Sequence, residues 1–188
     1  LRLAFSFSFI IHSPQPWNEW RGEKRYFEEN KAVWKALEDA YRAGKLRAIG
    51  VSNFLIDDLE SLLPSCDIKP MVNQVLAHIG NTPMELIRFC QKQGIAMEAY
   101  SPIAHGEALK STSIVSMAKK YGVSVPQLCI KYILQLGLAA LPKASTPEHM
   151  RDNASLDFEI SAEDLYALGM LDFKEYGEHR HFPVFSGK

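Results

Sequence analysis

The sequence has 188 residues, with 47% hydrophobic side chains, 23% charged side chains and a formal net charge of −1. These values fit one soluble domain with a substantial core, and the near-zero charge gives no electrostatic reason to expect binding to nucleic acid or to a membrane surface. No apolar run approaches the roughly 18 residues of a membrane-spanning helix. The three cysteines, Cys66, Cys90 and Cys129, are too far apart in sequence to form a metal-ligand pair, so we expect no metal site. Their odd number gives no complete disulfide framework, so we expect a cytoplasmic protein.

Short apolar runs alternate with helical patterns along the chain. They predict strands over residues 5–11, 47–51, 71–75, 95–100 and 138–141. They predict helices over residues 28–43, 114–121 and 126–136, and four more that start near Leu55, at Pro83, at Pro147 and after Ser161. Four glycines are expected to end helices, as glycine commonly does: Gly44, Gly94, Gly122 and Gly137. Residues 176–188 show no clear period.

The alternation of strands and helices predicts an α/β fold, with a parallel sheet and helices outside it. Five predicted strands are fewer than the eight of a closed (β/α)8 barrel, which typically needs about 250 residues. The sheet is therefore either an open α/β sheet or part of a barrel. No glycine-rich dinucleotide-binding fingerprint follows a strand, which argues against a Rossmann fold. Because no linker or low-complexity tract divides the chain, we expect residues 1–188 to form a single domain.

A polar cluster follows each predicted strand, and in a parallel barrel all these strand ends lie on the face that carries the active site. Taken singly, these residues also fit structural roles: a loop histidine, a helix cap, a turn residue or a solvated lysine. Their shared position is what favours a functional site. The clusters are His12, Ser52-Asn53, Asn73-Gln74, Tyr100-Ser101-Pro102, and Lys143 with Ser145 and Thr146.

Several ordered motifs resemble those of the aldo-keto reductase family. Residues 46–54 (LRAIGVSNF) resemble the signature around the fifth strand of that family, and residues 10–14 (IIHSP) resemble the end of its fourth strand. Residues 72–74 (VNQ) and 94–102, ending in AYSP, resemble strands six and seven, and residues 141–148 (LPKASTPE) resemble the phosphate-binding signature after strand eight. The resemblance covers roughly residues 9–175 and implies a partial (β/α)8 TIM barrel of about five parallel strands with outer helices.

Members of this family bind a nicotinamide cofactor across the strand ends, so the resemblance implies a role for each matching residue. Ser52, Asn53 and Gln74 would bind the carboxamide, Tyr100 would stack on the nicotinamide ring, and Ser101, Pro102 and Ile103 would line the pyrophosphate path. Lys143, Ser145 and Thr146 would meet the adenosine 2′-phosphate, and Asn153 would contact adenine. The resemblance makes NADP the expected cofactor, and NAD is also possible because His149 stands where the family usually has an arginine.

The catalytic chemistry of the family uses an aspartate, a tyrosine, a lysine and a histidine, of which only the histidine has a match here, His12. By resemblance, His12 would orient and polarise the substrate carbonyl, and Trp17 would line either the substrate pocket or the barrel rim. A truncated or frame-shifted reading frame would explain the missing residues. We expect an NADP(H)-dependent oxidoreductase that reduces aldehydes or ketones to alcohols by hydride transfer, inactive or impaired as this chain. The alternatives are a non-catalytic nucleotide-binding remnant and an interaction fragment that self-associates through exposed barrel edges.

Overall fold

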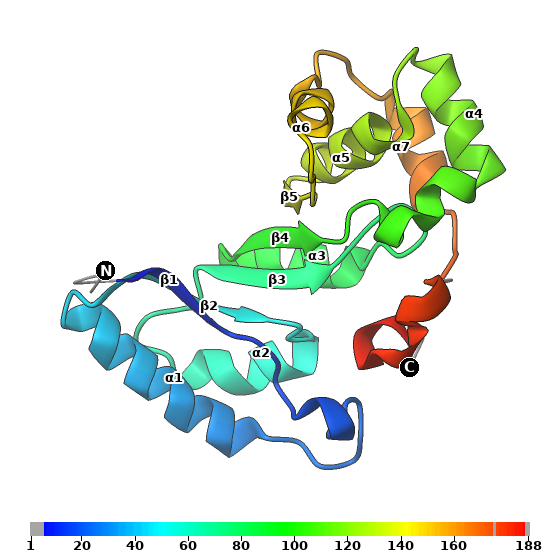
Figure 1. Cartoon of the computed structure of the whole chain (residues 1–188). Coiled ribbons are helices and arrows are strands. Elements are labelled where there is room, and N and C mark those ends of the chain that lie inside the picture. Colours follow the sequence, from blue (N-terminus) through cyan, green and yellow to red (C-terminus); the bar gives the residue numbers. More distant parts are fainter. Residues whose placement is uncertain (1–5, 175, 187–188) are drawn as a thin grey trace. The chain divides into compact units, whose positions relative to one another are not determined.

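A computed structural model describes residues 6–174 and 176–186 of the chain (Figure 1). The strands are β1 (Ser6–Ile11), β2 (Leu46–Ser52), β3 (Val72–Leu76), β4 (Ala96–Tyr100) and β5 (Ala139–Leu141). The α-helices are α1 (Phe27–Arg42), α2 (Ile56–Leu62), α3 (Met84–Gln93), α4 (Thr112–Lys120), α5 (Val125–Gln135), α6 (Pro147–Ala154) and α7 (Ala162–Gly169). The 3₁₀ segments are Trp17–Glu19, Leu63–Ser65, Ala104–Lys110, Gly177–His181 and Pro183–Phe185.

The predicted strands and helices are confirmed, with ends that differ by one or two residues. Phe5, the predicted start of the first strand, lies outside the described residues. The helix predicted to start at Pro83 begins at Met84 instead. The C-terminal segment, whose sequence shows no clear period, contains two 3₁₀ segments.

The strands follow one another in a single sheet in the order β1-β2-β3-β4-β5. The pairs β1–β2, β2–β3 and β4–β5 are parallel. In the β2–β3 pair, Val51 is opposite Asn73 and Ser52 is opposite Gln74. The predicted α/β class with a parallel sheet is therefore confirmed, and the register brings the polar ends of neighbouring strands to the same level.

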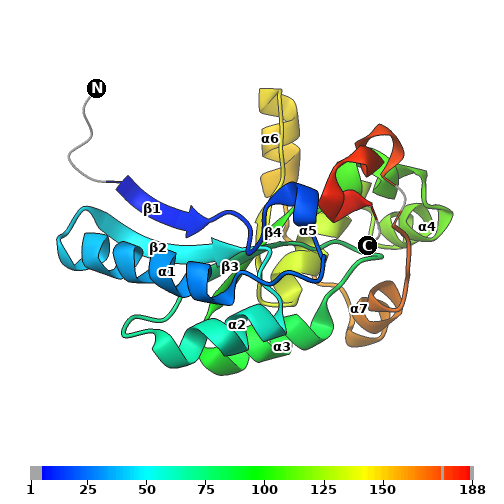
Figure 2. The same cartoon turned by 90° about the horizontal axis from the view of Figure 1, so that it is seen from below.

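The chain forms two compact units. Unit 1 consists of Leu1–Val75 and Met84–Met97, and unit 2 of Leu76–Pro83 and Glu98–Lys188. In unit 1, helices α1, α2 and α3 lie on one face of strands β1, β2 and β3 (Figure 2). Its core combines fully buried side chains of helices and strands: Trp34, Ile49, Val51, Leu59, Leu62 and Ile87.

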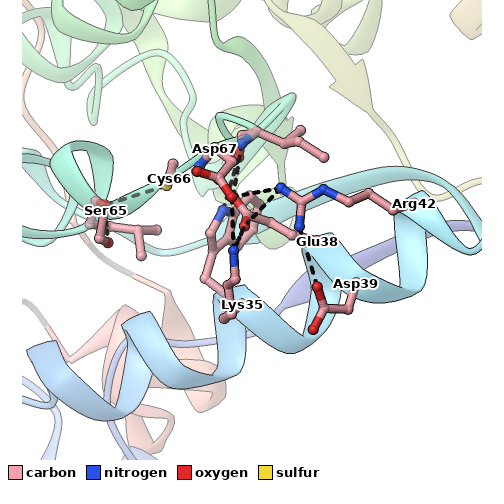
Figure 3. Close-up of polar contacts among 10 residues, drawn as sticks. Lys35, Glu38, Asp39, Arg42, Ser65, Cys66 and Asp67 are labelled. Carbon is pink, nitrogen blue, oxygen red and sulfur yellow. Dashed lines mark hydrogen bonds and ion pairs between the residues drawn. The ribbon is translucent and has the colours of Figure 1, made fainter.

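A buried carboxylate ties α1 to the segment that follows α2 (Figure 3). Glu38 is fully buried, and its Oε1 accepts hydrogen bonds from the backbone N–H groups of Asp67 and Ile68 at 2.7 and 2.8 Å. Its Oε2 faces Lys35 Nζ at 3.3 Å and Arg42 Nη2 at 3.6 Å. The paired charges compensate the cost of burying this carboxylate.

In unit 2, α5 packs against α4, α6 and β5. A separate apolar cluster forms where Ala104, Tyr176 and Phe185 are buried together, with Tyr100 and other partly buried side chains packed against them. We name this the tail cluster, because two of its members come from the C-terminal segment. Among the residues that the structure describes, no helix is both long and apolar enough to cross a membrane.

Candidate functional site

The carboxyl ends of β1, β2 and β3 bring together the predicted residues of unit 1. The Ser52 hydroxyl donates to the Gln74 carbonyl at 2.8 Å, and the Asn53 backbone N–H donates to the same oxygen at 2.9 Å. The Asn53 side-chain amide donates to the His12 carbonyl and to Ser52 Oγ, both at 3.0 Å. These bonds join three strand ends into one polar group of His12, Ser52, Asn53 and Gln74, here called the strand-end cluster.

The backbone of this cluster is unusual at one position. Asn53 has φ of 61°, in the left-handed region that asparagine tolerates better than most residues with a side chain. It is buried, as is Ser52. The turn after β2 is thus held in a specific conformation by hydrogen bonds to two neighbouring strands.

His12 is exposed at the end of β1, and its ring meets the Trp17 ring edge to face at a centroid distance of 5.5 Å. The loop that follows is organised by buried Gln15, whose amide donates to the Lys24 carbonyl at 2.6 Å. This loop, the start of α2 and Asn53 line a cleft of about 190 Å³. The structure places Trp17 beside the histidine, which is compatible with both roles predicted for it.

An ion pair that the sequence did not indicate closes one side of this cleft. Arg25 binds Asp57 and Asp58, at 2.6 Å for Asp58. Arg25 lowers the pKa of Asp57, whereas burial raises the pKa of Asp58. A separation of more than 30 positions along the chain hides such a pair from any local pattern.

In unit 2, the end of β4 continues into the predicted pyrophosphate-binding residues. Ser101 also has a left-handed backbone, with φ of 53°, and its hydroxyl lies 3.1 Å from His105 Nε2. The His105 ring stacks on His179 at a centroid distance of 4.2 Å, and burial lowers the pKa of His105. Pro102 is buried and Ile103 is half-buried. The described residues with metal-ligating side chains form no group of three or more that could hold a metal ion.

The predicted phosphate-binding residues gather at the start of α6. Thr146 caps this helix, since its Oγ1 accepts from the His149 backbone N–H at 3.2 Å. Lys143, Ser145, Thr146 and His149 are exposed, and Asn153 is half-buried. A lysine, hydroxyl groups and the amino end of a helix are chemically suited to a phosphate group.

A buried histidine–tyrosine pair in unit 2 was missed by sequence reasoning. His78 Nε2 lies 2.8 Å from the Tyr176 hydroxyl, and His78 Nδ1 lies 2.6 Å from the Ile79 carbonyl. Burial lowers the pKa of His78 to about 4 and raises the pKa of Tyr176 to about 12. Nδ1 must donate to the carbonyl, so Nε2 of the neutral ring accepts the tyrosine proton. Tyr176 is thus an anchor of the C-terminal segment and a poor proton donor at neutral pH.

Comparison with known proteins shows the family to which the chain belongs. The model of the aldo/keto reductase family matches residues 8–171, and the chain belongs to this family. The predicted family resemblance and its barrel-derived fold class are therefore confirmed.

Among the relatives, the uncharacterized oxidoreductase YtbE of Bacillus subtilis is 42% identical over 165 residues, which are 87% of this chain and 55% of that protein. Glyoxal reductase of the same organism is 39% identical over 176 residues, 93% of this chain and 60% of that protein. The crystal structure of aldo-keto reductase AKR2E5 of the silkworm Bombyx mori, complexed with NADPH, gives a TM-score of 0.78 at 30% identity over 90% of this chain and 55% of that one. The chain spans little more than half the length of these relatives.

Proposed function

We propose that the chain provides the nucleotide-binding part of an NADP(H)-dependent oxidoreductase that interconverts carbonyl compounds and alcohols by hydride transfer. The strand-end cluster is the observation that carries this proposal, because it gathers His12, Ser52, Asn53 and Gln74 in hydrogen-bonding contact. The family membership supports it, and so does the similarity to the silkworm reductase that was crystallised with NADPH.

In unit 1, the amide groups of Asn53 and Gln74 and the Ser52 hydroxyl suit the carboxamide of a nicotinamide ring, which both donates and accepts hydrogen bonds. Bound NADPH would supply the hydride. His12 lies at the end of the neighbouring strand β1 and is exposed, so a substrate carbonyl could accept a hydrogen bond from its ring. That bond would orient the carbonyl and stabilise negative charge on its oxygen.

In unit 2, Tyr100 would stack on the nicotinamide, and Ser101, Pro102 and Ile103 would lie along the pyrophosphate. Lys143, Ser145, Thr146 and His149 would hold the 2′-phosphate, with Asn153 at the adenine. Histidine is a weaker cation than arginine, and its charge depends on pH. With His149 at this position, discrimination against NAD(H) should be modest.

A polypeptide of these 188 residues should bind the nucleotide but turn over aldehydes negligibly. The tyrosine, lysine and aspartate used for proton transfer in the family have no counterpart in the resemblance, and positioned general acid catalysis contributes about 10²–10⁴ in rate. Rates typical of a complete carbonyl reductase, measured with NADPH and a test aldehyde, would contradict this expectation.

The decisive experiment is a titration of the chain with NADPH and, separately, with NADH. Binding is measured as quenching of the intrinsic fluorescence. Saturable binding, tighter for NADPH, is the expected result. No saturable binding of either nucleotide would refute the proposal. Replacing Gln74 by Ala should weaken binding, whereas Gln91→Ala, on α3 away from the strand ends, should not.

One observation supports a second role for this chain, self-association. β1 is the outermost of the strands that the structure describes in unit 1, and its Phe9 is 52% exposed. An outer strand with an exposed aromatic side chain favours pairing with another strand, here from a second copy. Light scattering should detect a dimer or larger species of the wild type, and Phe9→Lys should convert it to a monomer. A wild type that stays monomeric at high concentration would exclude self-association.

A further inference from the structure

The end of β2 and the turn after it carry two of the proposed nicotinamide-binding residues, Ser52 and Asn53, in a conformation that needs support. Asn53 sits in the left-handed region, with φ of 61°. Residues with a side chain remain there only where the surrounding structure holds them. The supports of this turn therefore decide where Ser52 and Asn53 point.

Hydrogen bonds support the turn from two sides. On one side, Ser52 and Asn53 bind the Gln74 carbonyl, as described above. On the other side, the Asn73 side-chain amide donates to the carbonyl of Phe54, the residue directly after Asn53, at 2.9 Å. Gln74 contributes its backbone carbonyl to this support, whereas Asn73 contributes its side-chain amide.

The contact leaves Asn73 with an unsatisfied polar atom. Its side chain is 0% exposed and also lies beside Cys90 of α3, with Nδ2 3.9 Å from the sulfur. The side-chain amide of Asn73 cannot be flipped to exchange its oxygen and nitrogen, because the Phe54 carbonyl accepts hydrogen bonds and cannot donate one. Oδ1 is consequently buried with no hydrogen-bond partner among the described residues. A buried unpartnered oxygen is unfavourable, so an asparagine is a poor choice here if it serves packing alone.

We infer that Asn73 is a positioning residue for the nicotinamide end of the cofactor. By fixing the Phe54 carbonyl, it holds the preceding Asn53 in its left-handed conformation and keeps Ser52 and Asn53 directed toward the carboxamide. It acts through these residues and does not touch the cofactor. This inference rests on the proposed function and adds a residue that the family resemblance did not assign.

The test compares two ligands that share one end of the cofactor. NADPH carries both the nicotinamide and the 2′-phosphoadenosine, whereas adenosine 2′,5′-bisphosphate has only the latter. Calorimetric titrations would be made with wild type, Asn73→Ala and Asn73→Leu. The leucine variant keeps the side-chain volume and removes the unpartnered oxygen. Both variants should bind NADPH about tenfold more weakly, as expected when a hydrogen-bonded contact is misplaced, and bind the bisphosphate as wild type does.

The matched control is Cys90→Ala, which changes the neighbour of Asn73 but keeps the bond to Phe54. It should leave both affinities unchanged. If the Asn73 variants lost affinity for both ligands equally, Asn73 would have a general structural role. If their affinity for NADPH were unchanged, Asn73 would have no role in positioning. Either result overturns the inference while leaving the proposed function intact. If wild type binds neither ligand, the proposed function itself fails.

Discussion

Replacement of Glu38 by alanine should destabilise unit 1 strongly. The side chain is fully buried and accepts two backbone hydrogen bonds, from Asp67 and Ile68. Hydrogen bonds to a charged group contribute about 1.5–3 kcal/mol each, and breaking a buried charge network typically costs about 3–5 kcal/mol. Because Lys35 and Arg42 are partly exposed and can be solvated after the change, we expect a loss of about 3 kcal/mol. Glu38→Gln keeps one acceptor oxygen and should cost about 1–2 kcal/mol.

Urea unfolding followed by tryptophan fluorescence suits this test. All three tryptophans of the chain, Trp17, Trp20 and Trp34, belong to unit 1, and the Trp34 indole donates to the Ile68 carbonyl at 2.9 Å. The control is Asp39→Ala, since the Asp39 side chain is 68% exposed and an exposed ion pair contributes at most about 1 kcal/mol. If Glu38→Ala cost no more than Asp39→Ala, the buried carboxylate would not be the anchor of this segment.

Three further predictions concern unit 2 and the cofactor. The pKa of His78 is about 4 in the folded chain against an ordinary 6.5, so the unfolded state takes up the proton first as pH falls. The free energy of unfolding should fall by roughly 2 kcal/mol as the pH is lowered from about 7 to about 5. Urea unfolding of the His78→Phe variant at these two pH values should show no such fall. Gly80→Ala should cost about 2 kcal/mol or more in thermal unfolding, because a Cβ there would lie 2.2 Å from the Phe173 ring. The same change at Gly94, where a Cβ meets nothing within 4 Å, should cost only about 1 kcal/mol. His149→Arg should raise the preference for NADPH over NADH about tenfold, and an unchanged ratio in calorimetry would remove His149 from the phosphate site.

Local features of the sequence were sufficient to predict most of the secondary structure. Gly44, Gly94, Gly122 and Gly137 were predicted to end helices, and all four have positive φ, between 66° and 83°. The helix predicted to start at Pro147 does begin there, and the hydroxyl of the preceding Thr146 caps it. Each of these signals depends on residues within one or two turns of the chain, which is the range that a sequence pattern reflects.

The strand-end cluster was predictable for a different reason. Parallel strands present their carboxyl ends at one edge, so the order of the strands alone placed His12 near Ser52, Asn53 and Gln74. The contacts that could not be predicted join distant residues without a repeating pattern. His78 and Tyr176 are 98 positions apart, and Glu38 lies in a helix whose periodicity does not distinguish a buried carboxylate from an exposed one.

Tyr100 packs against the tail cluster with Tyr176 and Phe185. If a ligand displaced the Tyr100 ring, binding and packing of the tail cluster would be coupled, and such coupling is reciprocal by thermodynamic linkage. A planar ligand stacked on Tyr100 would change how firmly the C-terminal segment is held. Sequence variation in the last dozen residues would in turn adjust affinity for that ligand without contacting it, giving evolution a means of tuning binding from the end of the polypeptide.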